Sequence, residues 1–317
     1  MSASDFSHVV PAGLDLAALQ QAIEERWDSS IIPTLCDFIR IPNQSPFFDS
    51  EWASNGFMDQ AITLCMTWAQ NLGLKGMRMR LVREGARTPC IFAIVDATKP
   101  DASDKTVLMY AFFKIDIPHD SPFLIPRFPI FNILISFCRY SHMDKQPPMT
   151  ADWEDGLGPY TPVIRDGRLY GRGGADDGYG LFAALSAVKA LQDAGVPHGR
   201  LVLMTEACEE SGSIDLPYYV ETLASEIGNV SAIVCLDSGA GNYEQLWMTT
   251  SLRGAIAGTL RVKILNEGIH SGAASGVVPS SFRIIRILLD RLEDSKTGRV
   301  HQAFHTVIPP HRFEEAA

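Results

Sequence analysis

Four groups of acidic and imidazole side chains follow one another along the chain, each after an apolar run or in a glycine-rich turn. They are His142 with Asp144, Asp176–Asp177, Glu209–Glu210 and Asp237. The intervals between them are too long for one helix face, so the groups must come from different elements. In open α/β sheets, residues at successive strand ends can converge outside the carboxyl edge. The order therefore predicts an α/β sheet with one shared acidic site.

The residue types in these groups suit a hard or borderline divalent metal. Imidazole and carboxylate ligands bind zinc, manganese or cobalt. A carboxylate can bridge two ions about 4 Å apart, which together activate a water and polarise a carbonyl. Asp144 stands two residues after His142 and is suited to fixing its tautomer. The adjacent Glu209 and Glu210 side chains diverge, so one can bind metal while the other acts as a general base.

A glycine-rich stretch before the second group invites another interpretation. Gly171-Arg-Gly-Gly-Ala-Asp176 is similar to a nucleotide-binding loop. However, Asp176 stands where the dinucleotide pattern has its third glycine. Two consecutive carboxylates, Asp176 and Asp177, would also repel phosphate. The sequence therefore favours a metal site over a nucleotide site.

Taken together, the motifs resemble the carnosine dipeptidase and aminoacylase-like family of two-metal exopeptidases, metallopeptidase family M-twenty. The resemblance runs from about residue 12 to the end, apart from one internal stretch. That family has a zinc exopeptidase catalytic domain of the phosphorylase/hydrolase-like type, an α/β fold with a mixed sheet flanked by helices. An α+β lid or dimerisation domain is inserted in it. The resemblance rests on His142-Met-Asp144, Asp166 to Gly178, Glu206 to Ser213, Cys235 to Ala240 and Gly268-Ile-His-Ser-Gly272.

The resemblance implies a metal ligand set. His142 and Asp237 would hold one ion, Glu210 would hold the second, and Asp176 would bridge the two. The resemblance also implies a cis peptide bond between Asp176 and Asp177. The cofactors would be two divalent ions, zinc first, with manganese and cobalt as alternatives.

The resemblance also implies three catalytic residues and a reaction. Glu209 would be the general base, Asp144 would orient the ligating histidine, and His270 in the lid would stabilise the oxyanion. His270 reaches across a dimer in many members of the family. The expected activity is hydrolysis of a peptide or N-acyl amide bond in a small peptide or an N-acyl amino acid. A homodimer through the lid is the expected assembly.

Composition narrows the class of partner and the compartment. A length of 317 residues allows two domains, and a hydrophobic content of 46% supports a sizeable core. The net charge of −10 argues against nucleic acid and anionic membranes as partners. Six cysteines without C-x-x-C spacing predict reduced thiols in a cytoplasmic protein. The start of the chain lacks a basic region followed by an apolar run, so we expect no secretion signal.

Hydrophobic periodicity predicts alternating helices and strands, as expected of an α/β domain. We assign residues 1–251 to a catalytic domain and residues 252–317 to a partial lid. In the lid we expect a strand over 255–265 and a helix over 280–292. In the catalytic domain we expect helices over 14–35, 57–72 and 180–194, and strands over 77–82, 90–95, 106–110, 201–204 and 232–236.

Residues 111–140 depart from the family pattern, in which the third strand runs directly into the histidine motif. Charges and four prolines interrupt this apolar stretch, so it is not a membrane span. The residues on either side would join smoothly without it. We interpret it as a retained intron or a gene-prediction error. The alternative is a genuine loop that covers the entrance to the site.

The end of the chain is the second departure. The chain stops at Ala317, and the last histidine ligand of the family would lie beyond that residue. His301, His305 and His311 fall within the expected lid, so none of them is assigned to the metal. We therefore expect a truncated member of the family. The alternative function is an inactive fragment that binds metal or dimerises without turnover.

Overall fold

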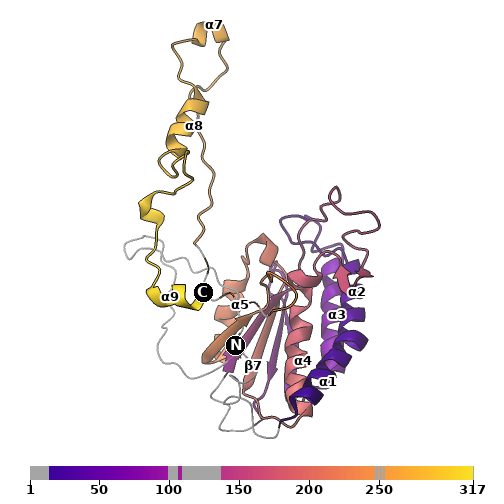
Figure 1. Ribbon diagram of the computed structural model, residues 1–317. Coiled ribbons are helices and arrows are strands. Elements are labelled where there is room, and N and C mark those ends of the chain that lie inside the picture. Colours follow the sequence, from indigo (N-terminus) through magenta and orange to yellow (C-terminus); the bar gives the residue numbers. More distant parts are fainter. Residues whose placement is uncertain are drawn as a thin grey trace. The chain divides into compact units, whose positions relative to one another are not determined.

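A computed structural model describes residues 14–98, 106–108, 137–245, 247, 249, 252 and 254–316 (Figure 1). The chain divides into two compact units. The first unit is Met1–Leu252 and the second unit is Arg253–Ala317. The assignment of these units to catalysis and to a lid stays a prediction.

A six-stranded mixed sheet forms the centre of the first unit, in the order β1-β2-β7-β3-β4-β8. β2 is antiparallel to β1 and β7, whereas β3, β4, β7 and β8 run parallel to one another. A separate hairpin pairs β5 (Val163–Arg165) with β6 (Arg168–Tyr170). The strands of the main sheet are β1 (Met77–Val82), β2 (Cys90–Val95), β3 (Thr106–Leu108), β4 (Phe137–His142), β7 (Arg200–Glu206) and β8 (Val230–Cys235).

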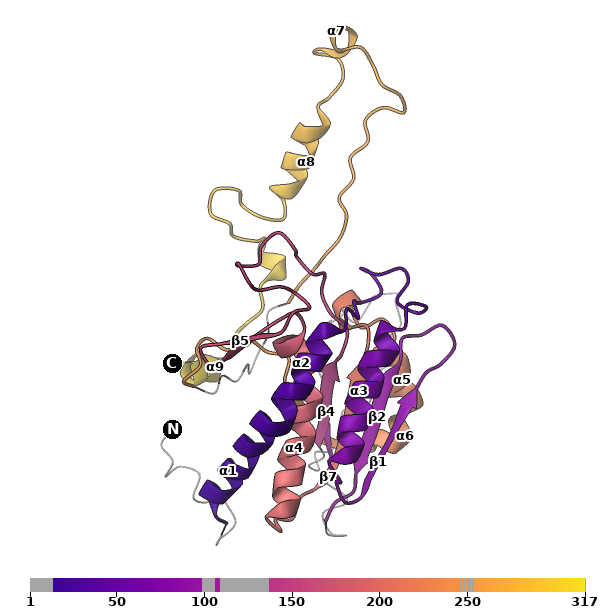
Figure 2. The ribbon, with the colours of Figure 1, turned by 90° about the vertical axis from the view of Figure 1, so that its right-hand side faces the viewer.

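Helices cover both faces of this sheet (Figures 1 and 2). Alternate residues of β2 point to opposite faces, as the two-residue period of a strand requires. Ile91 and Ala93 pack in the core beneath the larger helical layer, and Phe92 and Ile94 pack on the other side. One layer consists of α1 (Leu16–Arg26), α2 (Ile32–Arg40), α3 (Phe57–Asn71) and α4 (Gly180–Asp193), and the other of α5 (Leu216–Thr222) and α6 (Ala224–Ile227).

The observed elements confirm the predicted α/β class, with some differences in detail. The strands over 77–82 and 90–95 have the predicted bounds. The helix expected over 14–35 is two helices, α1 and α2, joined by a π-helical turn at Trp27–Ile31. No helix in the described part of the chain is both long and apolar enough to cross a membrane.

The second unit contains α7 (Ser271–Ala274), α8 (Ser281–Leu289) and α9 (Pro310–Ala316). The prediction of a strand over 255–265 is wrong, because these residues have no strand structure. An apolar, β-branched run becomes a strand only where a neighbouring strand pairs with its backbone N–H and C=O groups. No described segment pairs with this run.

β3 and β4 together occupy the space between β7 and β8. β3 pairs with the start of β7, where Leu108 lies opposite Val202. β4 pairs with the end of β7, where Ser141 lies opposite Thr205. Only two positions of β7 separate these partners, whereas the whole stretch 109–140 of the chain lies between Leu108 and Ser141. A continuous strand would need only two residues there, so the rest of that stretch is in excess.

This excess equals the length of the insertion predicted over residues 111–140. Residues 137–140, the last four of this stretch, belong to the sheet, because their backbones pair with residues 232–235 of β8. Residues 109–136 lie outside the described part of the chain. The choice between a retained intron and a genuine loop at the site entrance therefore stays a prediction.

Deleting residues 111–140 should leave the first unit folded and raise its soluble yield. In the shortened chain, Met109 and Tyr110 would fill the two positions beside β7, and His142 would keep its present register. The deletion also removes an apolar segment that favours aggregation. Soluble expression and the thermal unfolding midpoint, both compared with the parent chain, measure the effect.

A deletion of residues 111–139, shorter by one residue, is the matched control. It shifts the register of the strand by one, which turns every side chain, including that of His142, to the opposite face of the sheet. We expect this variant to aggregate. If the 111–140 deletion unfolds instead, the segment is a native element of the fold. If both deletion variants fold equally well, the register of this strand does not determine whether the first unit folds.

Candidate metal centre

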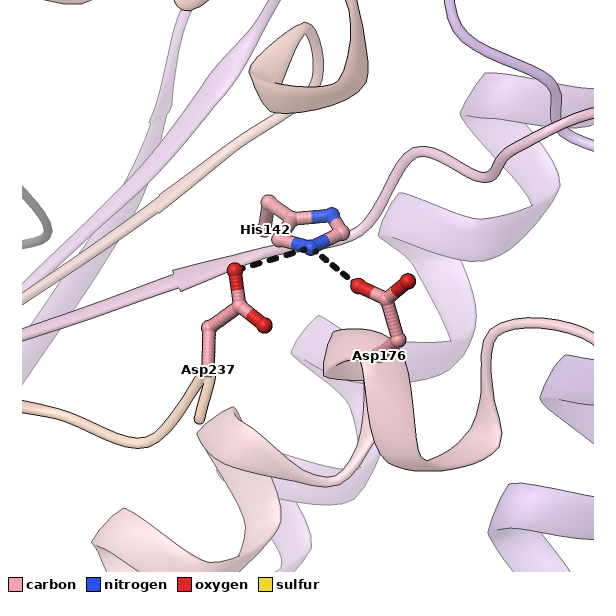
Figure 3. Close-up of side chains that lie close together, drawn as sticks. All are labelled: His142, Asp176 and Asp237. Carbon is pink, nitrogen blue, oxygen red and sulfur yellow. Dashed lines mark hydrogen bonds and ion pairs between the residues drawn. The ribbon is translucent and has the colours of Figure 1, made fainter. Parts of the chain in front are cut away.

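The four predicted groups lie together at the carboxyl ends of three parallel strands. His142 is the last residue of β4, Glu209–Glu210 follow β7, and Asp237 follows β8. Asp176 comes from the turn that precedes α4. Figure 3 shows His142, Asp176 and Asp237 pointing toward one another. Parallel strands present their carboxyl ends at one edge of the sheet, which is why residues so far apart in sequence meet here.

His142 lies at the centre of this cluster, with its side chain fully buried. Its Nδ1 lies 3.0 Å from the main-chain carbonyl oxygen of Asp144. A carbonyl oxygen can only accept, so Nδ1 carries a proton and donates it, while Nε2 faces the carboxylates. Nε2 lies 3.0 Å from Asp176 Oδ1, 3.7 Å from Asp237 Oδ2 and 3.9 Å from Glu209 Oε2.

Two sets of possible ligand atoms share this histidine. His142, Asp176 and Asp237 form one set, and His142, Glu209 and Glu210 form the other. Within each set the atoms lie within 4.8 Å of one another. Asp176 and Glu210 also lie close enough to shift each other's pKa, so the Asp176 carboxylate is near both sets. The arrangement could hold one or two divalent ions.

Asp144 supports the site through hydrogen bonds that its carboxylate accepts. Its Oδ1 accepts the N–H of Glu209 at 3.2 Å and its Oδ2 accepts the N–H of Glu210 at 3.1 Å. Oδ1 is 3.5 Å from His142 Nδ1, farther than the Asp144 carbonyl oxygen. The main chain of Asp144 therefore orients the histidine, while its carboxylate mainly holds the turn of the two glutamates.

The turn that carries Asp176 is closely packed and rich in glycine. Gly173 has φ +81°, and a Cβ there would lie 2.5 Å from Cε of Lys145. At Gly178 a Cβ would lie 2.4 Å from Cε1 of Phe38. Only glycine allows this close approach. The Asp176–Asp177 peptide bond is cis, as the family resemblance implied.

Sequence reasoning assigned no role to three residues that hold this site. Gln146 donates a hydrogen bond to Oε2 of Glu210. The hydroxyl of Tyr179 donates to the carbonyl oxygen of Leu236, next to Asp237, at 2.5 Å. Ser211 is linked to the 45–47 loop through its hydroxyl. Proximity in sequence to the predicted ligands was the only signal for them.

The site is strongly acidic, and its carboxyl groups disturb one another. Burial, together with neighbouring carboxylates, raises the pKa of Glu209 and that of Glu210 to about 7 each. Burial also raises the pKa of Asp177 to about 8 and that of Asp237 above its ordinary value. Like charges in a buried site favour the protonated form, and a cation would relieve this repulsion.

The pKa shifts of His142 and Asp176 are of the opposite kind, because both favour the charged form of the side chain. Burial lowers the pKa of His142, but hydrogen bonds with Asp144 and Asp176 and the nearby negative charges outweigh it, and the net pKa lies well above the usual value. The hydrogen bond with His142 lowers the pKa of Asp176. The local field around Nε2 therefore attracts positive charge.

His270 belongs to the second unit. It is exposed, and its Nδ1 accepts the N–H of Gly272 at 3.1 Å, at the start of α7. Its assignment to oxyanion stabilisation stays a prediction.

Comparison with known proteins agrees with the resemblance read from the motifs. Residues 138–278 match peptidase family M20/M25/M40. The chain is 33% identical over 186 residues to the Beta-Ala-His dipeptidase of Rattus norvegicus, a stretch that covers 57% of this chain and 37% of that protein. It is 30% identical over 156 residues to the Cysteinylglycine-S-conjugate dipeptidase of Corynebacterium striatum, covering 49% of this chain and 34% of that protein. The chain thus spans well under half the length of these curated relatives.

A solved structure shares the fold. Human carnosine dipeptidase 1 superposes with a TM-score of 0.56 at 22% identity, covering 94% of this chain and 57% of that one. The α/β fold class and the resemblance to carnosine dipeptidases are thereby confirmed.

Replacing Gly173 with alanine should destabilise the first unit more than the same change at Gly195. Both glycines have positive φ, +81° and +67°, so alanine costs about 1 kcal/mol of backbone strain at each. At Gly173 the added methyl also presses on Lys145, and overpacking adds about 1–3 kcal/mol. At Gly195 no atom lies within 4 Å of the added Cβ.

Urea unfolding of both variants measures the difference in the free energy of unfolding. A Gly173→Ala variant that is no less stable than Gly195→Ala would contradict the close packing of the Asp176 turn.

Proposed function

We propose that this chain, of which residues 138–278 match peptidase family M20/M25/M40, is a metal-dependent hydrolase of peptide or N-acyl amide bonds. The observation that carries the proposal is the convergence of His142 with Asp176, Glu209, Glu210 and Asp237 at the carboxyl edge of the sheet. The dipeptidase names of the similar proteins support a small peptide as substrate, with an N-acyl amino acid as the alternative.

The residues present fit a divalent metal. Zinc in catalytic sites is bound by imidazole nitrogen and carboxylate oxygen atoms, and manganese and cobalt bind the same ligands. Oε1 of Glu210 is buried without a hydrogen-bond partner in the described structure, a state that costs about 1–3 kcal/mol unless a cation satisfies it. We propose that His142 and Asp237 hold one ion, that Glu210 holds a second, and that Asp176 bridges them.

The protein's own groups would perform the remaining steps. When bound, the ions would polarise the scissile carbonyl and make a water more acidic. Glu209 would take the proton of the attacking water and pass it to the leaving amine. Asp144 would hold Glu209 in place through the backbone N–H, and His270 would stabilise the oxyanion.

Assembly and location belong to the same proposal. A homodimer through the second unit is supported by α8, whose apolar Phe282, Ile287 and Leu289 are exposed in this chain. A cytoplasmic location is supported by the five cysteines of the described part, all of which are free thiols.

A second candidate is a chain that binds one ion without turnover. His142 is the imidazole of both ligand sets in the described residues, and one Nε2 atom can bind only one ion. The second ion would then be held by carboxylates alone, without the nitrogen donor that commonly contributes to zinc sites.

Zinc titration separates these candidates. We expect two ions per chain for the hydrolase and one for the non-catalytic alternative, measured by calorimetry and elemental analysis. Binding should tighten from pH 6 to pH 8 and release protons. The reason is that the pKa of about 7 of Glu209 and Glu210 leaves both protonated at lower pH, where protons compete with the metal. A chain that takes up no metal at pH 8 would overturn both candidates.

Changing Glu209 to Gln should lower the hydrolysis of a β-alanyl-histidine dipeptide by about 100- to 10,000-fold, because general base catalysis contributes about that much. Zinc content should stay the same. The control is Glu221→Gln, on the exposed surface of α5. Loss of zinc together with activity would make Glu209 a ligand instead. A parent chain that binds zinc but does not hydrolyse the dipeptide supports the second candidate.

A further inference from the structure

Lys145 is a fully buried lysine that the proposed mechanism does not use. Its side chain lies at 0% exposure, and the described part of the chain offers it no ion pair with a carboxylate. Its Nζ instead donates to the carbonyl oxygens of Phe38 and Ile41, both at 2.6 Å, and approaches that of Ile39 at 3.5 Å. The same nitrogen lies 4.2 Å from the centroid of the Phe38 ring.

These carbonyls lie at the carboxyl end of α2. The last carbonyls of a helix have no partner within the helix and carry partial negative charge. The Phe38 carbonyl accepts the N–H of Ile41 at 3.1 Å, and Lys145 adds a donor to it and to the Ile41 carbonyl from a distant part of the chain, just after His142. Burial lowers the pKa of Lys145 to about 7, so enclosing this amine costs free energy that an apolar side chain would not cost. The contact therefore favours a specific geometry over simple space filling.

The stem of Lys145 also supports the turn that carries Asp176. Gly173 lies so close that a Cβ there would meet three carbons of the lysine stem at 2.5 to 2.9 Å. At the other end of the turn, Gly178 packs in the same way against the ring of Phe38. Lys145 and the end of α2 thus form one surface on which the turn rests.

The backbone of Lys145 connects to a third segment of the site. Its N–H donates to the carbonyl oxygen of Asn43 at 3.1 Å, and its own carbonyl accepts from Ser45 at 3.0 Å. The hydroxyl of Ser45 lies 2.5 Å from that of Ser211, the residue after Glu210. Lys145 therefore contacts the Asp176 turn directly and reaches the Glu209–Glu210 turn through Ser45. The segment that carries Asp237 is the one described site segment outside these contacts.

We propose that Lys145 is a positioning residue that fixes the separation between His142 and Asp176, and with it the geometry of the metal centre. It touches neither the metal nor the reacting atoms. Its amine ties the segment after His142 to the end of α2. Its carbon chain packs against the Asp176 turn and sets the position of that turn. The 3.0 Å distance between His142 Nε2 and Asp176 Oδ1 depends on both contacts.

The test is Lys145→Met, which keeps the length and the apolar stem but removes the donors. We expect an unchanged far-UV circular dichroism spectrum and zinc binding weakened by about 10- to 100-fold, the range typical for residues that orient ligands. Lys189→Met is the matched control, because Nζ of Lys189 pairs with Asp193 on the surface of α4. This control should bind zinc as the parent does.

Hydrogen–deuterium exchange of the metal-free proteins provides a second readout that does not depend on the proposed function. Lys145→Met should exchange faster over residues 38–46 and 171–179, with no change in α3. If the parent binds no zinc, the proposed function fails, but the exchange comparison still decides the role of Lys145.

Parent-like zinc affinity with parent-like exchange would overturn the proposal and leave Lys145 a space-filling residue. Lys145→Gln covers the case in which the methionine variant does not fold. It keeps an N–H donor on a shorter side chain, so we expect zinc binding weaker than that of the parent, and no loss at all would again overturn the proposal.

Discussion

The burial of several neighbouring carboxyl groups at the carboxyl edge of the sheet is the constraint on which the site of the first unit depends. Burial and neighbouring acids disfavour the charged forms of the carboxyl groups here, which raises the pKa values of Glu209, Glu210 and Asp237. Such a cluster stays together only if each member is held by rigid backbone. The parallel strands β4, β7 and β8 provide that backbone, and the imidazole of His142 lies within 4 Å of the carboxylates of Asp176, Glu209 and Asp237.

Supporting hydrogen bonds convert this strand framework into a defined site. Asp144 binds the backbone of both glutamates, so the turn after β7 is tied to the segment after β4. Lys145, the next residue, ties that same segment to α2 and to the turn of Asp176. Two consecutive residues, one acidic and one basic, therefore link segments of the site that are far apart in sequence. This explains how side chains that repel one another are kept close.

Local periodicity predicted much of the fold, and its failures have a common cause. The strands over 77–82 and 90–95 have the expected bounds because their alternation, or their unbroken apolar run, reflects burial within one element. The run over 255–265 has the composition of a strand but no described pairing partner, so it forms none. Residues 137–140 likewise belong to β4 because they pair with β8, and a pairing partner cannot be read from the local sequence.

The sequence by itself determined which residues could bind metal, their order along the chain and the α/β class that brings strand ends together. Only the tertiary structure decided which atoms face the site. It placed the carbonyl of Asp144, rather than its carboxylate, nearest Nδ1 of His142, and it brought Lys145 onto α2. The physical reason is that residue spacing reports the period of one element. Distances between groups that are far apart in sequence depend on strand order, register and the packing of turns against helices.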